Sequence, residues 1–200
     1  MFWVRMLTIS CTEVRKKEFE KHVTDKLEEL FQMGKTASKH FKYVGLELEQ
    51  KEDFSIVASQ EDYAKKIEMI YIDPARKKNR GENLTDEEKS KLRKVAGSIG
   101  WLGRQTRPDV LFSQVEMSTR FIRGTVDDLV NAQKAVKKVS SQKNFIIFKD
   151  LGPVDGWKIE VSTDAAHRNL QEAYSTEAVV IMIRGKEDTI APLSWQCNKI

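Results

Sequence analysis

Hydrophobic periodicity changes once along this 200-residue chain, near Ser141, and that change limits the folds open to it. Before it, apolar residues recur every three or four positions, which is typical of helices with one buried face. After it, short apolar runs alternate with turn residues such as Gly152 and Pro153. The order predicts an α+β fold in which most of the helices precede a group of strands.

Three helices are predicted between residues 85 and 139. The motif Thr85-Asp-Glu-Glu88 has the form of a capping box and begins the first helix, whose apolar face continues to residue 102. Pro108 disfavours a helical conformation for the residue before it and suits the first turn of a second helix, which extends to residue 124. Thr125-Val-Asp-Asp128 resembles another cap and begins the third helix.

The beginning of the chain predicts a helix and a hairpin. Apolar positions recur at helical spacing over residues 12–33. Residues 41–49 and 54–58 flank a polar four-residue loop, which predicts two paired strands. Gly45 lies inside the first of these strands and suggests a bulge or a close approach by another backbone.

A further helix is predicted after the hairpin. Ser59-Gln-Glu-Asp62 has the form of a capping box, and the apolar residues that follow it predict a helix through Ile70. Residues 76–83 are polar, basic and contain a glycine. This segment predicts a loop and is the best candidate for a linker between domains.

Three strand-like runs follow the helices, at residues 157–164, 178–184 and 189–195. Asp164 ends the first run. A carboxylate in this position is where a metal-dependent nuclease site would begin, because hard cations prefer oxygen ligands. No helix is predicted after these strands, so we expect one apolar face of their sheet to be exposed.

Composition excludes some classes of protein but does not identify a ligand. The net charge is +4, but 30 acidic residues are interspersed among 34 Lys and Arg, so charge alone does not require nucleic acid. Cys11 and Cys197 are too far apart in sequence to suggest a disulfide framework or a zinc cluster. Arg5 interrupts the apolar start, and no run approaches the roughly 20 apolar residues of a membrane span. We expect a soluble, intracellular protein.

Taken in order, several motifs resemble the Pol polyprotein of copia-type retrotransposons, from the back of the reverse transcriptase palm into RNase H. The resemblance covers residues 12–197. Its most recognisable stretch is Lys94-Val-Ala-Gly-Ser-Ile-Gly-Trp-Leu102, which leads into Thr106-Arg-Pro-Asp109 and Ser118-Thr-Arg-Phe121. The other motifs are Phe19-Glu-x-x-Val23, His40-Phe-Lys-Tyr-Val-Gly-Leu-Glu47, Ser59-Gln-x-x-Tyr63-Ala-Lys-Lys-Ile67, Ser162-Thr-Asp164-Ala and Pro192-Leu-Ser-Trp195.

The resemblance implies three segments and their partners. Residues 1–83 correspond to the end of the palm, with a hairpin like the primer grip and the entry to the thumb. Residues 84–141 correspond to the helical thumb and connection, and residues 142–200 to a truncated RNase H-like domain. The family acts with Mg²⁺ on RNA–DNA hybrids or primer–template duplexes. Missing Pol segments would be partners of this chain if they are encoded nearby.

The resemblance also implies roles for individual residues. Tyr43 and Gly45 of the hairpin would contact the primer, and Asp164 would be the first RNase H carboxylate and a ligand of Mg²⁺. The cations of the helical segment would contact phosphates, as basic side chains do. These are Arg104, Arg107, Arg120, Arg123, Lys134, Lys137 and Lys138. The lysines also fit the simpler interpretation of a solvated helix face.

The chain departs from the family at its catalytic positions. Where the family has a Tyr-Val-Asp-Asp strand, the aligned residues are Trp3-Val-Arg-Met6, and a cation and a thioether cannot replace two ligand carboxylates. Glu177 lies in a Ser-Thr-Glu-Ala sequence before the second strand, where the family has a turn rather than its second acid. We expect that acid beyond Ile200, and the rest of the palm and the fingers before Met1.

Asp164 is therefore expected to lack its catalytic partners within this sequence. The leading interpretation is a catalytically incomplete fragment of a copia-type reverse transcriptase. Two alternatives stay open: a nucleic-acid-binding module without catalysis, and a vestigial or protein-interaction chain with no retained activity. A metal or acid–base role for His167 is disfavoured, because lone histidines are more often structural or solvated.

Overall fold

The computed structural model describes residues 21–23, 25–27, 29–30, 39–168 and 174–200. It divides into two units, Met1–Ser38 and Lys39–Ile200. The described residues of the first unit are helical, as predicted from the spacing of apolar positions. The rest of the helix predicted over residues 12–33 lies outside the described residues.

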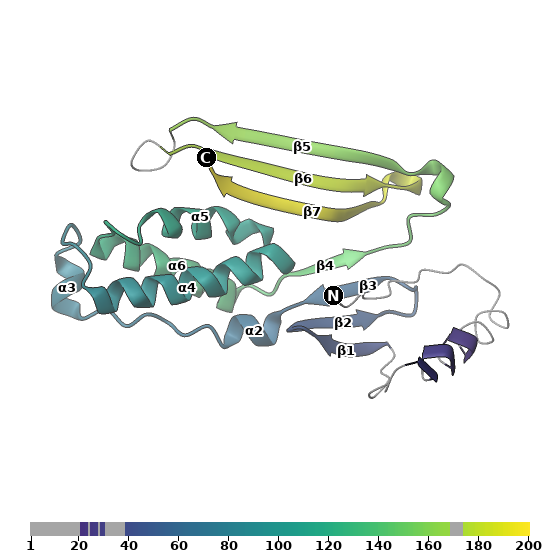
Figure 1. The fold of residues 1–200 in the computed structure, drawn as a ribbon, viewed down its shortest axis with the longest axis horizontal. Helices are drawn as coiled ribbons and strands as arrows, with labels where there is room; N and C mark the ends of the chain where they lie inside the picture. Colours follow the sequence, from purple (N-terminus) through teal and green to yellow (C-terminus); the bar gives the residue numbers. More distant parts are fainter. Residues whose placement is uncertain (1–20, 24, 28, 31–38, 169–173) are drawn as a thin grey trace. The chain divides into compact units, whose positions relative to one another are not determined.

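The second unit has a mixed α+β fold with two antiparallel sheets (Figure 1). The first sheet has the order β1-β2-β3-β4, formed by His40–Tyr43, Leu46–Gln50, Ile56–Ser59 and Phe145–Phe148. The second has the order β5-β6-β7, formed by Lys158–Ala166, Thr176–Arg184 and Ile190–Lys199. The helices between β3 and β4 are α2 (Glu61–Lys65), α3 (Pro74–Lys78), α4 (Asp86–Gln105), α5 (Leu111–Thr119) and α6 (Val126–Ser141).

Helix α4 confirms the strongest local prediction. Thr85 Oγ1 accepts a hydrogen bond from the backbone N–H of Glu88 at 3.2 Å, and Glu88 Oε2 accepts one from the backbone N–H of Thr85 at 2.8 Å. This reciprocal capping satisfies two donors that the helix itself cannot satisfy. Helix α6 begins at its predicted place, whereas α5 ends at Thr119, earlier than the predicted residue 124.

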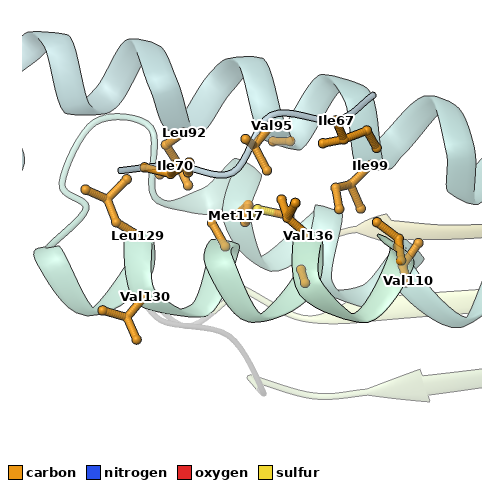
Figure 2. Packing of buried hydrophobic residues seen from close by; sticks show 14 of the residues in the cluster. Ile67, Ile70, Leu92, Val95, Ile99, Val110, Met117, Leu129, Val130 and Val136 are labelled. Atoms are coloured by element: carbon orange, nitrogen blue, oxygen red, sulfur yellow. The ribbon is translucent and has the colours of Figure 1, made fainter. Parts of the chain in front are cut away.

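The hydrophobic core lies among the helices. Side chains of α4, α5 and α6 meet those of an extended segment that follows α2 (Figure 2). Leu92, Ile99 and Leu129 are fully buried. Burial of each such side chain stabilises the fold by roughly 1.5–3 kcal/mol, so this cluster is the main source of cohesion in the helical part. The extended segment contributes Ile67, Ile70 and Ile72.

The extended segment corrects one prediction. The helix expected from residue 59 to Ile70 stops after the five residues of α2. Its predicted cap fails because Ser59 is the last residue of β3, and its hydroxyl donates to Glu47 Oε2 at 3.0 Å. Isoleucines spaced two and three apart are buried by an extended chain as well as by a helix, so their periodicity did not distinguish the two.

The hairpin prediction was also wrong in its first strand. Residues 41–49 form two strands rather than one, because Val44 and Gly45 make a tight turn with φ values of 47° and 80°. Glycine adopts positive φ without strain, whereas valine rarely does. The apolar β-branched residue therefore hid the turn, and the element is a three-stranded meander instead of a hairpin with a bulge.

Residues 76–83 were expected to be a loop, but the first part of the segment is helical. Helix α3 begins at Pro74, and Asp73 caps it by accepting a hydrogen bond from the backbone N–H of Ala75 at 2.8 Å. Proline at the first helical position is already in a helical φ and has no N–H to satisfy. The segment after α3 is bonded to α6, since the backbone N–H of Val126 donates to the carbonyl of Glu82 at 3.0 Å.

Strand β4 connects parts of the sequence that were assigned to different domains. It lies within the third predicted segment, residues 142–200, yet it pairs along its length with β3 of the first segment, residues 1–83. The core likewise joins residues on both sides of position 83. The packing of the second unit therefore crosses both predicted boundaries.

The three closing strands are present and form the second sheet, as expected. The expected exposure of an apolar face is present, since Ile159 and Val161 of β5 are 71% and 58% exposed. Helix α5, from earlier in the chain, lies against β7 at the opposite edge, where Trp195 Nε1 donates to the carbonyl of Gly103 at 2.8 Å. The sheet thus has one edge in contact with the helices and an exposed apolar face at the other edge.

Close approach of α4 and α5 requires glycine at position 103. A Cβ atom added to Gly103 would lie 2.8 Å from Leu111 Cδ2, which is too close. We expect Gly103→Ala to lower the free energy of unfolding by about 1–2 kcal/mol, despite the better helix propensity of alanine. Gly97→Ala on the same helix is the control, because no atom lies within 4 Å of the added carbon. It should raise stability by about 0.5–1 kcal/mol in urea unfolding. Equal effects of the two substitutions would contradict the packing described.

Candidate functional site

Arg107 is a buried cation at the centre of a polar network at the corner between α4 and α5. Its side chain is only 3% exposed, and its Nε and Nη2 donate to the two carboxylate oxygens of Asp109 at 2.8 and 3.0 Å. Its Nη1 donates to the backbone carbonyl of Gln142 at 2.9 Å. One side chain therefore bonds the corner to the end of α6.

Lys138 joins the same network from α6. Its Nζ lies 3.1 Å from Asp109 Oδ2 and donates to the backbone carbonyl of Asp109 at 3.2 Å. The Arg107 guanidinium, with a smaller contribution from Lys138, lowers the pKa of Asp109 from 3.8 to about 2. Asp109 therefore stays ionised and offsets the charge of both cations.

Arg120 is also engaged inside the protein. Its side chain is 9% exposed, and Nε lies 3.3 Å from Asp128 Oδ1. The other oxygen of that carboxylate accepts hydrogen bonds from the backbone N–H and the hydroxyl of Thr125, at 2.7 and 3.2 Å. Arg120 thus supports the carboxylate that caps α6.

Arg107 and Arg120 are therefore not positioned to contact a duplex. A guanidinium buried among its own partners would have to break them before reaching a phosphate. The sequence motif could not reveal this, because an arginine beside a proline or in a helix has no local signal of burial.

The exposed predicted arginines do not lie together. Arg104 and Arg123 are both exposed. Arg123 follows α5, whose end contacts the first half of α4 through the bond from Arg93 Nη2 to the carbonyl of Phe121, at 3.4 Å. Arg104 lies 11 residues further along α4 than Arg93, which is roughly 16 Å of helix. The two arginines therefore belong to different parts of the helical surface.

Lys134 and Lys137 form the most accessible cationic pair among the predicted residues. Both are exposed on α6 and are three residues apart, which places them on neighbouring turns of one face. Lys134 Nζ donates to the amide oxygen of Asn131 at 3.0 Å, and neither lysine has a carboxylate within 4.0 Å in the described chain. Helix α3, which packs against α6, adds exposed Lys77 and Lys78, which the sequence interpretation had treated only as part of a basic loop.

The predicted primer-contact residues lie at the first turn of the meander. Tyr43 is half-buried, and Gly45 follows it in the tight turn. A Cβ atom at Gly45 would lie 3.9 Å from Trp101 Nε1, so the turn lies beside α4. Trp101 is 37% exposed and Val44 is 59% exposed, which gives this turn an apolar surface rather than a cationic one.

Asp164 is exposed on β5, without a second carboxylate beside it. It is opposite Ala178, whose neighbour on β7 is Cys197. Glu177 pairs with Ala165 and therefore points to the other face, where it accepts a hydrogen bond from Asn198 Nδ2 at 3.3 Å. A Mg²⁺ site needs several oxygen ligands, and the described residues around Asp164 provide only one carboxylate, so they do not fit this ion.

His167 is the other residue for which a metal or acid–base role was considered. His167 Nδ1 lies 3.5 Å from Ser175 Oγ, which also accepts a hydrogen bond from the backbone N–H of Arg168 at 3.0 Å. Within the ranges that the structure describes, no three His, Cys, Asp or Glu side chains gather as metal ligands do.

A small pocket of about 120 Å³ lies between α2, the α4–α5 corner and the end of α6. Gln60, 1% exposed, lines it and accepts a hydrogen bond from Thr106 Oγ1 at 3.0 Å, while its amide nitrogen has no partner among the described residues. Lys65 and Lys143 lie at the rim and both pair with Glu61, at 2.7 and 3.5 Å. The pocket is lined by both polar and apolar atoms and is of a size for a few waters, and no motif in the sequence indicated it.

Comparison with known proteins does not add a family to these observations. A scan against protein-family models and a search of the curated proteins found no match to this chain. In the part of the chain that the structure describes, no helix combines the length and the apolar character that crossing a membrane requires.

The Arg107 network makes a prediction for stability. Arg107→Met removes the buried cation and leaves the carbonyl of Gln142 without its side-chain donor, so we expect the free energy of unfolding to fall by about 3 kcal/mol. Arg104→Met, three residues earlier and exposed, should change it by less than about 0.5 kcal/mol. Urea unfolding of both variants compares them, and an equal cost would show that Arg107 is not a structural cation.

The lowered pKa of Asp109 predicts how the stability of the fold depends on pH. Because the folded state holds this carboxyl ionised, its contribution to stability is complete above the ordinary pKa of 3.8 and is lost as the pH falls toward about 2. Asp109→Asn should therefore be less stable than wild type near neutral pH, and the difference should narrow across this window. A difference that does not vary with pH in chemical unfolding would contradict the assignment.

Proposed function

We propose that this chain is a fragment of a copia-type retrotransposon reverse transcriptase, from the end of the palm through the thumb and connection to the start of RNase H. The observation that carries the proposal is the stretch from Lys94 to Phe121. In sequence it is the most recognisable part of the resemblance, and in space it forms α4, the Arg107 corner and α5 around one core. Residues of this motif therefore have structural roles in the helices, the corner or the core.

The position of each segment supports the same proposal. Three of the four strands of the first sheet precede the helices, and a three-stranded antiparallel sheet follows them, with Asp164 near the end of its first strand. This is the order of elements that the resemblance implies. The length of β5 and β6, nine residues each, also suits the beginning of a larger sheet.

Catalysis is not part of the proposal for these 200 residues. The aligned polymerase positions hold Arg5 and Met6, and in the described chain Asp164 belongs to no group of three His, Cys, Asp or Glu side chains that could hold a metal. Mg²⁺, which the family uses to stabilise the developing charge of phosphoryl transfer, would need ligands from elsewhere. We infer that the residues present position a primer–template or RNA–DNA duplex, if they act at all.

The test of the family is the coding sequence around this reading frame. Sequencing the genomic nucleotides on both sides should find a Tyr-Val-Asp-Asp strand before the frame and an acidic RNase H helix after it, in any frame. The flanks would contradict the proposal if neither side carried a trace of either motif.

A second function, binding of a duplex without catalysis, is favoured by one observation. Lys134 and Lys137 present two exposed ammonium groups on one face of α6 with no carboxylate within 4.0 Å among the described residues. Phosphates bind such groups with release of counterions.

Salt dependence tests this second function. If both lysines neutralise phosphates, the double variant Lys134→Ala/Lys137→Ala should reduce the slope of log K against log salt by about 1.8 for an RNA–DNA hybrid. Lys94→Ala is the matched control, since Lys94 is exposed but already paired with Glu68 at 2.6 Å. Fluorescence anisotropy at several salt concentrations measures both. Unchanged slope in the double variant would reject duplex binding through this face.

A further inference from the structure

Strand β5 forms one edge of the second sheet. Strand β5 pairs with β6 through all nine of its residues, and no described strand pairs with its other side. The opposite edge, β7, is the one that contacts α5. Strand β5 is therefore the edge away from that contact, with a row of backbone donors and acceptors that a strand could pair with.

Protein edges are commonly protected by proline, a bulge or charged side chains, and of these β5 has only charged side chains, which are of both signs. Its pairing with β6 has no register shift, whereas the pairing of β6 with β7 has one at Ile181/Met182. Two apolar side chains, Ile159 and Val161, are 71% and 58% exposed on one face of the strand. Such an edge is suited to pairing with another strand.

The charges of β5 indicate which strand fits. Lys158 and Asp164 are both exposed and point to the same face of the sheet. Neither has an oppositely charged group within 4.0 Å in the described chain, because Glu160 between them is occupied by Arg184 at 2.5 Å. Lys158 and Asp164 lie three residues to either side of Val161.

An edge with opposite charges at equal distances from its centre is complementary to itself. In an antiparallel pair of β5 strands centred on Val161, Lys158 of each copy is opposite Asp164 of the other. Directly opposite side chains lie within reach of an ion pair. Twofold symmetry then makes each contact twice, as in any isologous interface.

The same centre suits the remaining side chains. Ile159 is opposite Thr163, Val161 is opposite its own copy, and Glu160 is opposite Ser162. The registers one step to either side are worse, because like charges oppose each other in them. A centre at Ser162 places Glu160 opposite Asp164, and a centre at Glu160 places this residue opposite its own copy.

We propose that β5 is a self-association edge, which pairs antiparallel with β5 of a second copy about Val161 and joins the two second sheets into one sheet of six strands. The dimer would shelter Ile159 and Val161 along their outer sides and satisfy the backbone groups of both edges. Asp164 acts here as an ion-pair partner across the interface.

Charge exchange tests the proposal on the full chain. Sedimentation velocity over a range of concentrations should show a reversible dimer for wild type. Lys158→Asp and Asp164→Lys each create two like-charge oppositions, so each should weaken the dimer about tenfold or more. The double variant Lys158→Asp/Asp164→Lys restores opposite charges with the order reversed, and it should regain most of the lost affinity.

Two controls accompany this test. Near-ultraviolet circular dichroism confirms that each variant is folded, and Asp155→Lys, in the exposed turn before β5, should dimerise like wild type. A wild-type chain that stays monomeric at every concentration would overturn the proposal. It would equally be overturned by a dimer that both single variants leave unchanged, which would point to stacking of the apolar sheet faces, or by a double variant that stays as weak as the singles.

Discussion

The buried guanidinium of Arg107 is the interaction on which the second unit most depends. It fixes the turn between α4 and α5 through Asp109 and holds the end of α6 through the carbonyl of Gln142. Strand β4 begins three residues after Gln142, at Phe145, and completes the first sheet by pairing with β3. A charge removed from water is costly unless its hydrogen bonds are satisfied, so the position of these three segments is specified together.

This network changes how the predicted nucleic-acid-binding cations are interpreted. The basic residues of the helical segment predicted that its arginines contact nucleic acid. In the structure Arg107 and Arg120 instead form ion pairs within the protein, and Lys138 pairs with Asp109. Of the predicted cations that stay exposed, Lys134 and Lys137 share one face of α6. The motif around Arg107 is thus explained by its role in holding the fold together.

Local rules predicted much of the fold and little of the site. The cap at Thr85 and the apolar face of α4 depend on residues that are close together in sequence, and both predictions were confirmed. The turn at Val44 was missed because its side chain suits a strand, and the burial of Arg107 was missed because its partner Gln142 lies 35 residues away. The edge position of β5 depends on which strands pair, which no single segment determines.

Hydrogen exchange in the native state most directly tests whether Arg107 joins the helical core to the first sheet. With Arg107→Met, we predict that backbone amides of the last turn of α6 and of the β3–β4 pairing lose protection together, while those of the first half of α4 keep more of theirs. Protection that falls uniformly across the second unit, or that falls at α6 while the β3–β4 pairing is unaffected, would contradict the central role of this side chain.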